Sequence, residues 1–382
     1  MKPMRALVTG ATGYVGSRLV TALLAEGHDV IVGSRNLAKL GMFGWIDDVK
    51  AAYLDADDPD SATSAFKLAG DVDVVYYLLH GIGQPGFREA DNLAAANVAR
   101  AAKAAGVKRI VYLGGFVPTD GELSEHLASR AEVAEALTIE GGPEVVWLGA
   151  AIIIGAGSTS FEMLRYVADR FLVIPLPSWA SNPLDPISIS DALYYLVAAA
   201  DPDRVPPGSY DIHGPETTTY GELLLSYARV AGLWRPGLPL FGIDTSLVSA
   251  VTGLILPVPG GLSGDLVESL DHPMKASSRG LTHLVPDPPG GLVDTDDAIA
   301  RSLERQRPLP VNELSDPHHL ADTDPRWAGG DTFRIRGLAS RVTPSAAKPA
   351  LCLIDNVPGP VAAWVRTGLD VMIGLVPRGA SS

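Results

Sequence analysis

Short apolar runs alternate with helical stretches through the first part of the chain. Apolar segments of strand length lie at 5–8, 29–32, 49–54, 73–79, 108–113 and 144–154. Stretches with helical spacing or composition lie between them at 17–26, 60–66 and 89–105. Strands that alternate with helices predict a parallel, doubly wound α/β sheet with right-handed crossovers. The unbroken apolar run Val74–Leu79 is typical of a strand buried on both faces.

After Ile154 the regular alternation fades and proline becomes frequent, with four prolines between residues 175 and 186. Long proline-rich loops predict a second, smaller module that covers the edge of the sheet and the substrate. We therefore divide the chain into residues 1–155, residues 156–310 and an extended tail, 311–382.

Two helices in the second part carry start signals. The first, at 192–200, has Ser190 or Asp191 as its cap. The second, at 220–232, is capped by Thr219, and Glu222 completes a capping box. Asp191 is therefore predicted to be structural.

The composition argues against several classes of protein. The 382 residues are 47% hydrophobic and 19% charged, which is typical of a folded chain. A net charge of −14 argues against nucleic acid as a partner, because phosphates attract clustered Lys and Arg. The single cysteine, Cys352, excludes an internal disulfide and a cysteine-built metal site, and it favours a cytoplasmic location. We expect no secretory leader, since the first strand begins at Arg5, and no run reaches the ~20 residues of a membrane span.

The most informative motif directly follows the first apolar run. It is Gly10-x-x-Gly13-x-x-Gly16, between a predicted strand and a predicted helix. Gly10 permits the turn, Gly13 lets the backbone approach a ligand, and Gly16 allows close packing of the helix. The helix N-terminus then directs N–H groups and the positive end of its dipole at a negative charge. A strand, a glycine turn and a helix in this order predict a site for the pyrophosphate of a dinucleotide. The other residues assigned to this site are Thr12, Tyr14 and Val15.

The end of the second predicted strand indicates which dinucleotide is bound. In this fold an acidic side chain at that point accepts a hydrogen bond from the 2′-hydroxyl of NAD, whereas an arginine suits the 2′-phosphate of NADP. Ser34 and Arg35 stand there, so NADP(H) is favoured over NAD(H). The alternative is that Arg35 is an exposed loop residue without a ligand.

The glycine turn and several later segments together resemble a known family. They include Asn97-x-x-x-Ala101-Ala102, followed by Ala105-Gly106-Val107-Lys108-Arg109, and the segments 123–133, 155–165 and 324–330. Over about residues 1–330 the chain resembles the short-chain dehydrogenase/reductase superfamily, in its atypical, NmrA-like branch of NAD(P)-binding Rossmann proteins. This resemblance implies that Asp55 contacts the adenine amino group and that Leu79 and His80 line the nicotinamide ribose. For His80 the alternative is a strand-end histidine bound to a neighbouring carbonyl.

Active members of that superfamily use a Tyr-x-x-x-Lys pair, in which the lysine lowers the pKa of the tyrosine for proton transfer. The corresponding helix here carries His126 and Arg130 at the same spacing, and the serine expected after the fifth strand is replaced in Leu113-Gly114-Gly115. The resemblance implies that His126 handles the proton, that Arg130 holds the ribose, and that Gly114 lies beside the cofactor. The alternative is that His126 and Arg130 are surface residues paired with Glu122, Glu125 or Glu132.

The second module supplies Phe161, Arg165 and Trp179 as candidate substrate contacts, although such residues at helical spacing are more often core. An apolar stretch at 247–256 either lines the cleft, which would favour an apolar substrate, or packs as core, which is the favoured alternative.

From residue 325 onward seven Lys and Arg face three Asp, and the apolar stretch 361–376 is too short and too charged to span a membrane. It could contact protein, which the acidic body favours, or lie on an anionic bilayer.

The sequence thus predicts an NADP(H)-dependent oxidoreductase that passes hydride between the nicotinamide and a carbonyl or quinone-like group of a small molecule. The competing hypothesis is a non-catalytic NAD(P)H-binding scaffold or redox sensor, which the missing tyrosine and serine favour. An epimerase or lyase with tightly held NAD(P) is less favoured, because the Tyr-Lys pair is missing.

Overall fold

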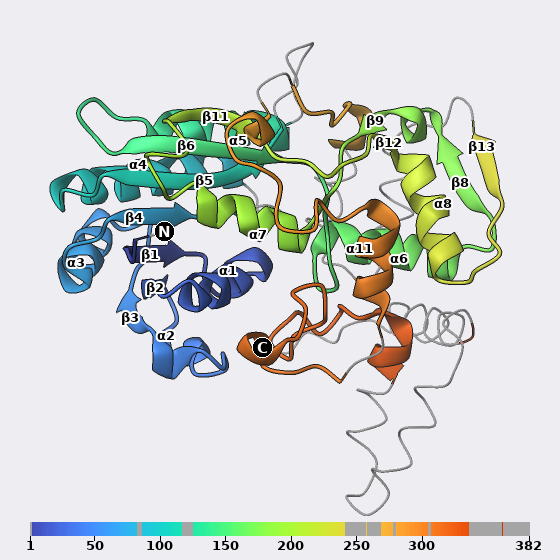
Figure 1. Ribbon diagram of the computed structural model, residues 1–382, viewed down its shortest axis with the longest axis horizontal. Coiled ribbons are helices and arrows are strands. Elements are labelled where there is room, and N and C mark those ends of the chain that lie inside the picture. Colours follow the sequence, from blue (N-terminus) through green and yellow to red (C-terminus); the bar gives the residue numbers. More distant parts are fainter. Residues whose placement is uncertain are drawn as a thin grey trace, which may run out of the picture.

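The computed structural model describes residues 2–81, 86–116, 125–240, 269–277, 280–304 and 307–335, together with Pro257 and Val361. Its largest feature is a seven-stranded parallel sheet in the order β11-β6-β5-β4-β1-β2-β3 (Figure 1). The strands are β1 (Arg5–Thr9), β2 (Asp29–Ser34), β3 (Lys50–Tyr53), β4 (Val74–Tyr77), β5 (Arg109–Gly115), β6 (Glu144–Ala150) and β11 (Gly208–Asp211). The strand order reverses between β1 and β4, so the predicted doubly wound Rossmann sheet is confirmed.

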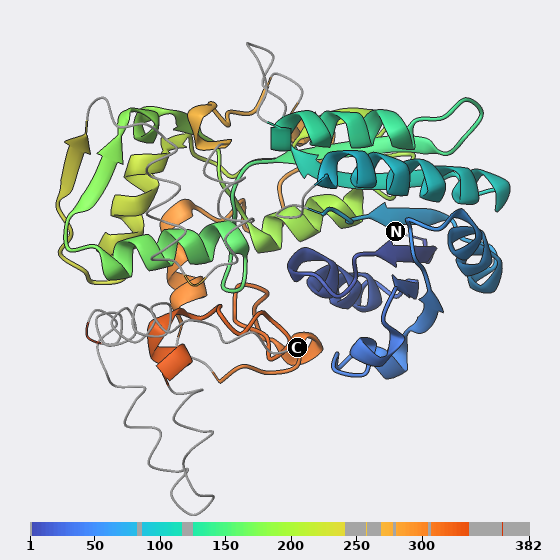
Figure 2. The same ribbon diagram turned by 180° about the vertical axis from the view of Figure 1, so that it is seen from behind.

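Helices cover both faces of this sheet (Figure 2). One face packs against α1 (Tyr14–Ala25) and α7 (Ile189–Ala198). The other packs against α3 (Pro59–Ala69), α4 (Phe87–Ala104) and α5 (Glu125–Leu137). Successive strand residues point to opposite faces, so Tyr76 enters the first core and Tyr77 the second. A short helix, α2 (Leu37–Leu40), follows β2.

A second module lies beside the sheet and has its own hydrophobic core. Its helices are α6 (Thr159–Arg170), α8 (Tyr220–Val230) and α11 (Thr295–Leu303). Three short strand pairs frame them: β7 (Ile153–Ile154) with β10 (Ile187–Ser188), β9 (Pro183–Leu184) with β12 (Thr218–Thr219), and β8 (Ile174–Pro177) with β13 (Gly237–Leu240).

The two modules are interleaved along the chain. After α6 the chain returns to the sheet, where α7 joins the core beneath α1 and β11 pairs with β6. Residues 307–335 then cross back to the first module, and the side-chain amide of Asn312 donates to the Gly44 carbonyl at 3.2 Å. The C-terminal segment therefore contacts the first module near Gly44.

Local structure agrees with most predicted bounds and differs at two points. The apolar run 144–154 is divided into β6 and β7. The cap of α7 is Ser188, rather than Ser190 or Asp191, because its hydroxyl accepts the N–H of Asp191 at 3.1 Å. Asp191 is structural in another way, since its carboxylate accepts the N–H of Val293 at 2.9 Å.

The Thr219 cap of α8 is confirmed, because the Thr219 hydroxyl accepts the N–H of Glu222 at 3.1 Å. The stretches 247–256 and 361–376 lie outside the described residues, apart from Val361. Among the helices that can be described, none is both long enough and apolar enough to cross a bilayer.

Candidate nucleotide-binding site

The candidate site begins where the strand order reverses, between β1 and β4. The hydroxyl of Thr9 donates to the Tyr76 carbonyl at 3.0 Å and accepts the N–H of Leu78 at 3.2 Å. These bonds hold the segment after β4 against the end of β1. Gly10 follows with a φ of +70°, and a Cβ there would lie 2.7 Å from the Leu78 carbonyl oxygen. Only glycine fits, because the conformation is left-handed and the neighbouring atom is backbone.

The other two glycines have separate roles in the turn. A Cβ at Gly16 would lie 2.2 Å from the Gly10 carbonyl oxygen, so α1 packs directly on the turn. A Cβ at Gly13 would meet only that same oxygen, at 3.2 Å, among the described atoms within 4 Å. The space in front of Gly13 is therefore open to a ligand, whereas the space at Gly16 is filled by the protein itself.

The amino end of α1 has the chemistry of an anion site. Gly13 is its N-cap, no side chain caps it, and no acidic residue lies in its first turn. The first N–H groups of a helix have no partner within the helix, and the dipole adds positive potential. The N–H groups of Tyr14, Val15 and Gly16 would thus hold a pyrophosphate, beside Thr12 in the turn. The open space at Gly13 makes these residues fit a dinucleotide.

The ends of β2 and β3 lie side by side, because Ser34 pairs in register with Tyr53. The Arg35 guanidinium lies 3.5 Å from the Asp57 carboxylate, and both side chains are more than half exposed, at 67% and 54%. The Asp55 carboxylate accepts the N–H of Asp57 at 3.3 Å. The Ser34 hydroxyl accepts a backbone N–H two residues on, at 3.1 Å. An exposed ion pair contributes little, so Arg35 can turn toward a phosphate at small cost.

On the other side of the reversal, β4 leads to Leu79, His80 and Gly81. Leu79 is half-buried and His80 is exposed. The N–H of Gly81 donates to the Asp91 carboxylate of α4 at 2.7 Å. Burial raises the pKa of Asp91, and the nearby positive charge of Arg130 acts in the opposite direction. The structure therefore places Arg130 near the segment that the resemblance assigns to the nicotinamide ribose.

Sequence reasoning did not single out Asp91. The residue lies on the buried face of α4, where Ala94, Ala95 and Val98 are its neighbours at helical spacing. An acidic side chain on the buried face of an alanine-rich helix is the signal that could have found it.

The residues predicted to replace the Tyr-Lys pair both lie on α5. His126 is its second residue, and its side chain is not among those described. Glu132, one of the alternative partners, is bound by Arg88 and Asn92, and the Arg88 hydrogen bond lowers the pKa of Glu132 to about 2. Glu132 is thus held by residues of α4, and the positive charge of Arg130 acts on Asp91 and Tyr112.

Packing explains why no serine stands at Gly114. A Cβ at this position would lie 2.6 Å from the indole nitrogen of Trp147 and 3.0 Å from the ring of Tyr112. Tyr112 itself donates its hydroxyl to the Arg130 carbonyl at 3.3 Å. Burial raises the pKa of Tyr112, so it does not supply the acidified hydroxyl of the Tyr-Lys pair.

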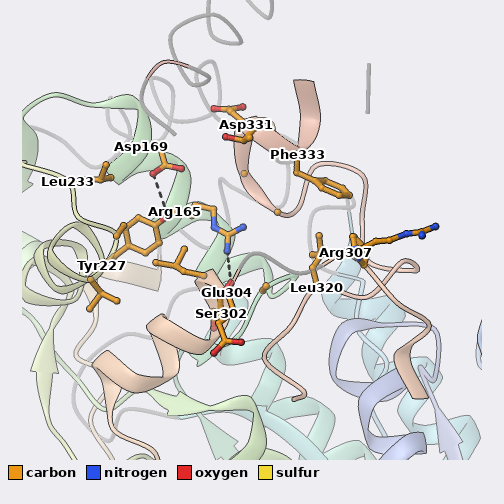
Figure 3. Close-up of a pocket in the computed structure, with 18 residues that line it drawn as sticks. Arg165, Asp169, Tyr227, Leu233, Ser302, Glu304, Arg307, Leu320, Asp331 and Phe333 are labelled. Carbon is orange, nitrogen blue, oxygen red and sulfur yellow. Dashed lines mark hydrogen bonds between the residues drawn. The ribbon is translucent and has the colours of Figure 1, made fainter. Parts of the chain in front are cut away.

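The three candidate substrate residues lie apart from the glycine turn. Phe161 is fully buried and meets Tyr227 edge-on at 5.9 Å, and Trp179 packs edge-on against Tyr220 at 6.2 Å. Both belong to the core of the second module. Arg165 instead lines a cavity between α6, α8, α11 and the C-terminal segment (Figure 3).

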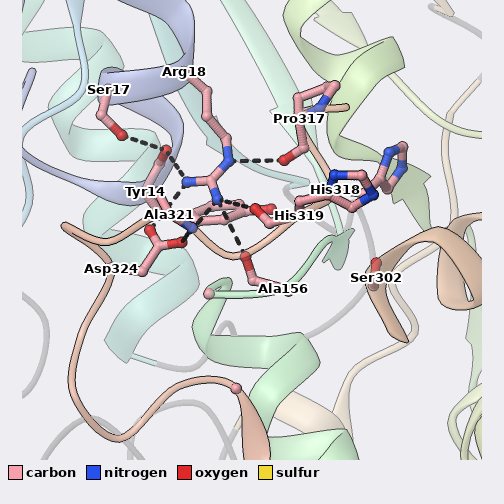
Figure 4. A network of polar contacts seen from close by, with 12 residues as sticks. Tyr14, Ser17, Arg18, Ala156, Ser302, Pro317, His318, His319, Ala321 and Asp324 are labelled. Atoms are coloured by element: carbon pink, nitrogen blue, oxygen red, sulfur yellow. Dashed lines mark hydrogen bonds and ion pairs between the residues drawn. The ribbon is translucent and has the colours of Figure 1, made fainter. Parts of the chain in front are cut away.

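A buried polar network ties α1 to the C-terminal segment (Figure 4). The Arg18 guanidinium is bidentate to Asp324, at 3.0 and 2.8 Å. It also donates to the carbonyls of Pro317 at 2.8 Å, His319 at 2.8 Å and Ala156 at 3.3 Å. Arg18 of α1 thus binds both Ala156, just before α6, and the C-terminal segment 317–324.

The Tyr14 ring lies against this guanidinium, 4.1 Å from the Arg18 carbon to the ring centroid. Its hydroxyl is buried without a hydrogen-bond partner among the described residues, and a Cβ at Gly155 would lie 1.9 Å from it. Burial raises the pKa of the Tyr14 hydroxyl. The side chain of Tyr14 packs against the second module, which leaves its backbone N–H as the group that would face the nucleotide.

Residues 10–138 match a family model described as NAD(P)H-binding. Pinoresinol reductase 1 of Arabidopsis thaliana is 32% identical over 163 residues, which are 38% of this chain and 49% of that protein. UDP-glucose 4-epimerase of Mycolicibacterium smegmatis is 33% identical over 129 residues, which are 30% of this chain and 40% of that protein. The chain thus matches less than half the length of these curated relatives.

Solved structures share the fold at low sequence identity. A nucleoside-diphosphate-sugar epimerase of Staphylococcus aureus has a TM-score of 0.62 at 18% identity, covering 78% of this chain and 100% of that one. The triphenylmethane reductase of Citrobacter sp., complexed with NADP(H), has a TM-score of 0.59 at 20% identity, covering 77% of this chain and 98% of that one.

The fold and the glycine turn define a dinucleotide-binding protein of the Rossmann class. The comparisons agree with this class: residues 10–138 match an NAD(P)H-binding family model, and the fold is similar to that of the epimerase and the reductase described above. The resemblance inferred from the sequence and the NAD(P)H cofactor class are confirmed.

Proposed function

We propose that the protein is an NADP(H)-dependent oxidoreductase that passes hydride between nicotinamide C4 and a carbonyl or quinone-like group of an apolar small molecule. The observation that carries the proposal is the open glycine turn at the reversal of strand order, with an exposed guanidinium at the adjacent strand end. Pinoresinol reductase and triphenylmethane reductase, both relatives by sequence or fold, support reduction as the class of reaction.

The preference for NADP(H) rests on Arg35. A guanidinium binds a phosphate through charge-assisted hydrogen bonds, and within the described part of the chain Arg35 pairs with the exposed Asp57. The 2′-phosphate of NADP(H) would replace Asp57 as the negatively charged partner of Arg35. The 2′-hydroxyl of NAD(H) carries no charge and could not replace it. Arg35 would therefore favour the phosphorylated cofactor.

The bound nicotinamide supplies or accepts the hydride, and the chain supplies the proton. In the reducing direction the carbonyl carbon gains hydride while its oxygen gains one proton, so the product is an alcohol. His126 is the proposed donor, because an imidazole titrates near neutral pH. The proposed role of Arg130 is to hold the ribose by hydrogen bonds, while Asp91 fixes the backbone of Gly81.

NADPH titration followed by intrinsic fluorescence tests the cofactor assignment. Arg35→Asp should weaken NADPH binding about 10-fold or more and leave NADH binding equal or stronger. Arg204→Asp is the matched control, since it makes the same charge change at an exposed position near the amino end of β11. An unchanged NADPH-to-NADH ratio in Arg35→Asp would refute the role of Arg35.

NADPH consumption over a panel of quinones and aldehydes tests the reaction. Wild-type protein should turn over at least one acceptor, and His126→Ala and His126→Gln should lose on the order of 10²-fold in rate with NADPH affinity kept. Turnover that is unaltered in both variants would remove His126 as the proton donor.

The second candidate function is a non-catalytic NAD(P)H sensor. The packing at Gly114 favours it, because no room is left for a serine. The Arg18 network also favours it, because this network links α1 to residues 317–324. Tight NADPH binding without turnover of any acceptor would support this alternative. Hydrogen exchange at 317–324 should then differ between the NADPH and NADP⁺ complexes.

A further inference from the structure

A cavity of about 640 Å³ lies in the second module, in the size range of small-molecule sites. It is bounded by α6, the end of α8, the end of α11 and the C-terminal segment (Figure 3). None of the residues assigned to the nucleotide lines it. Ala156, whose carbonyl accepts from Arg18, forms part of its wall, so the Arg18 network borders the cavity on the side of α1.

Arg165 is the central polar group of this cavity. Its side chain is buried, and the guanidinium lies 5.1 Å from the centroid of the Phe161 ring. One terminal nitrogen lies 3.3 Å from the Glu162 carboxylate, and the other donates to the Ser302 carbonyl at 3.1 Å. The third donor, Nε–H, has no hydrogen-bond partner among the described residues. A buried donor without a partner is unfavourable, so an acceptor brought to this group by a ligand would stabilise it.

Asp169 lies one helical turn after Arg165 and also faces the cavity. Its carboxylate accepts the hydroxyl of Tyr227 at 3.4 Å. Burial raises the pKa of Asp169, and the charge of Arg165 acts against this shift. The cavity therefore offers a hydrogen-bond donor and an acceptor on adjacent turns of α6.

The charges around the cavity balance. Arg165 and Glu162 form one pair without net charge. Asp331 binds both Arg170, at 2.7 Å, and Arg334, at 3.0 Å, so these three residues carry one net positive charge. The Asp169 carboxylate, next to Arg170 on α6, offsets this charge. The remaining charged lining residues, Glu304 and Arg307, have opposite signs. A ligand with a net charge would enter without a counter-charge, so the site suits a neutral molecule.

The other walls are apolar. Leu233, Leu320 and Phe333 line the cavity with apolar side chains (Figure 3). They would bury the hydrocarbon part of a ligand.

We propose that this cavity is a second small-molecule site, for a neutral ligand with an apolar body and a hydroxyl or carboxamide group. The ligand oxygen accepts from Arg165 Nε–H, and its O–H or N–H donates to Asp169. The site is separate from the one that holds the nucleotide, so its occupancy does not depend on the proposed oxidoreductase activity.

Five probes of similar size test this assignment by ligand-observed NMR titration at neutral pH, with and without NADPH. Benzamide and benzyl alcohol carry the required group, whereas toluene lacks it and benzoate and benzylamine carry a net charge. The first two should bind with dissociation constants of about 1 mM, at least several-fold tighter than the other three, in both cofactor states. No binding of benzamide and benzyl alcohol, or equal binding of all five probes, would overturn the proposal.

Three variants locate the binding. Leu233→Trp fills part of the cavity without changing its polar groups and should weaken benzamide about 10-fold. Leu238→Trp is the matched control, because Leu238 is exposed on β13 and lies outside the cavity. Arg165→Lys keeps a positive charge beside Glu162 but loses Nε–H, and it should reduce the preference for benzamide over toluene to about 1. Unchanged binding in Leu233→Trp would place the probes elsewhere and refute the site.

Discussion

The buried pair between Arg18 and Asp324 should contribute far more to stability than any exposed ion pair of this protein. The two side chains are 1% and 4% exposed, and the contact is bidentate. In Asp324→Asn the guanidinium stays buried without the negative charge of its partner, and the neutral amide offers it one acceptor oxygen in place of two. Breaking a buried pair in this way costs about 3–5 kcal/mol, because an uncompensated charge remains.

Arg18→Met should cost at least as much. It leaves the Asp324 carboxylate buried, with the Ala321 N–H at 2.8 Å as its remaining hydrogen-bond donor among the described residues. It also removes the donors of carbonyls that Arg18 now satisfies, including those of Pro317 and His319. The double variant should be less unstable than the sum of the single variants, with a coupling energy of about 2 kcal/mol or more.

The assay is urea-induced unfolding followed by tryptophan fluorescence, for the two single variants and the double variant. Arg229 and Asp296 are the matched control, since they form a similar bidentate pair at 2.5 and 3.1 Å with side chains 65% and 41% exposed. Arg229→Met and Asp296→Asn should each cost below about 1 kcal/mol. If Asp324→Asn costs no more than Asp296→Asn, the C-terminal segment is not held on α1 in the way described.

Three further predictions test the site and the cavity. Gly16→Ala should abolish NADPH binding and lower the melting temperature by several degrees, because the new Cβ would lie 2.2 Å from a backbone oxygen and force the turn and α1 apart. Gly41→Ala is the control and should change neither property, since its Cβ would have its nearest atom at 3.5 Å. Gly114→Ser should not create activity and should lower the melting temperature, because its Cβ would lie 2.6 Å from an indole nitrogen; a stable, more active variant would contradict the packing argument. Burial raises the pKa of Asp169 to about 6, above its unfolded value of ~3.9, so the stability from this group is present below pH ~4 and is lost as pH rises through ~6. Asp169→Asn should remove this decline, of about 3 kcal/mol, when urea unfolding is compared at either end of that range, and an unchanged slope would show that Asp169 titrates normally.

The sheet and the glycine turn could be predicted because their determinants are local. Val74–Leu79 is apolar on both faces because β4 lies between two helix layers. Gly10 and Gly16 are required by backbone atoms within a few residues or on the adjacent strand. The contact at Gly16 and the left-handed φ of Gly10 act within a single strand–turn–helix unit, and a sequence motif can record them.

The contacts of Arg18 could not be predicted in this way. Its partner Asp324 is 306 residues away, and most of its other acceptors are main-chain carbonyls, which leave no mark on residue type. An arginine in the second turn of a helix is more often exposed. The return of residues 307–335 to α1 was missed for the same reason, because a segment that docks through its backbone has the composition of a loop.

The position of α1 links the two halves of the molecule physically. Its first turn supplies the N–H groups that face the nucleotide, and its second turn carries Arg18. Arg18 also donates to the Tyr14 carbonyl at 3.3 Å, within that first turn. Nucleotide binding and the docking of residues 317–324 therefore both favour one placement of the same helix. If both stabilise the same placement of α1, thermodynamic linkage requires each to strengthen the other by the same factor, so we expect disruption of the Arg18–Asp324 contact to weaken NADPH binding.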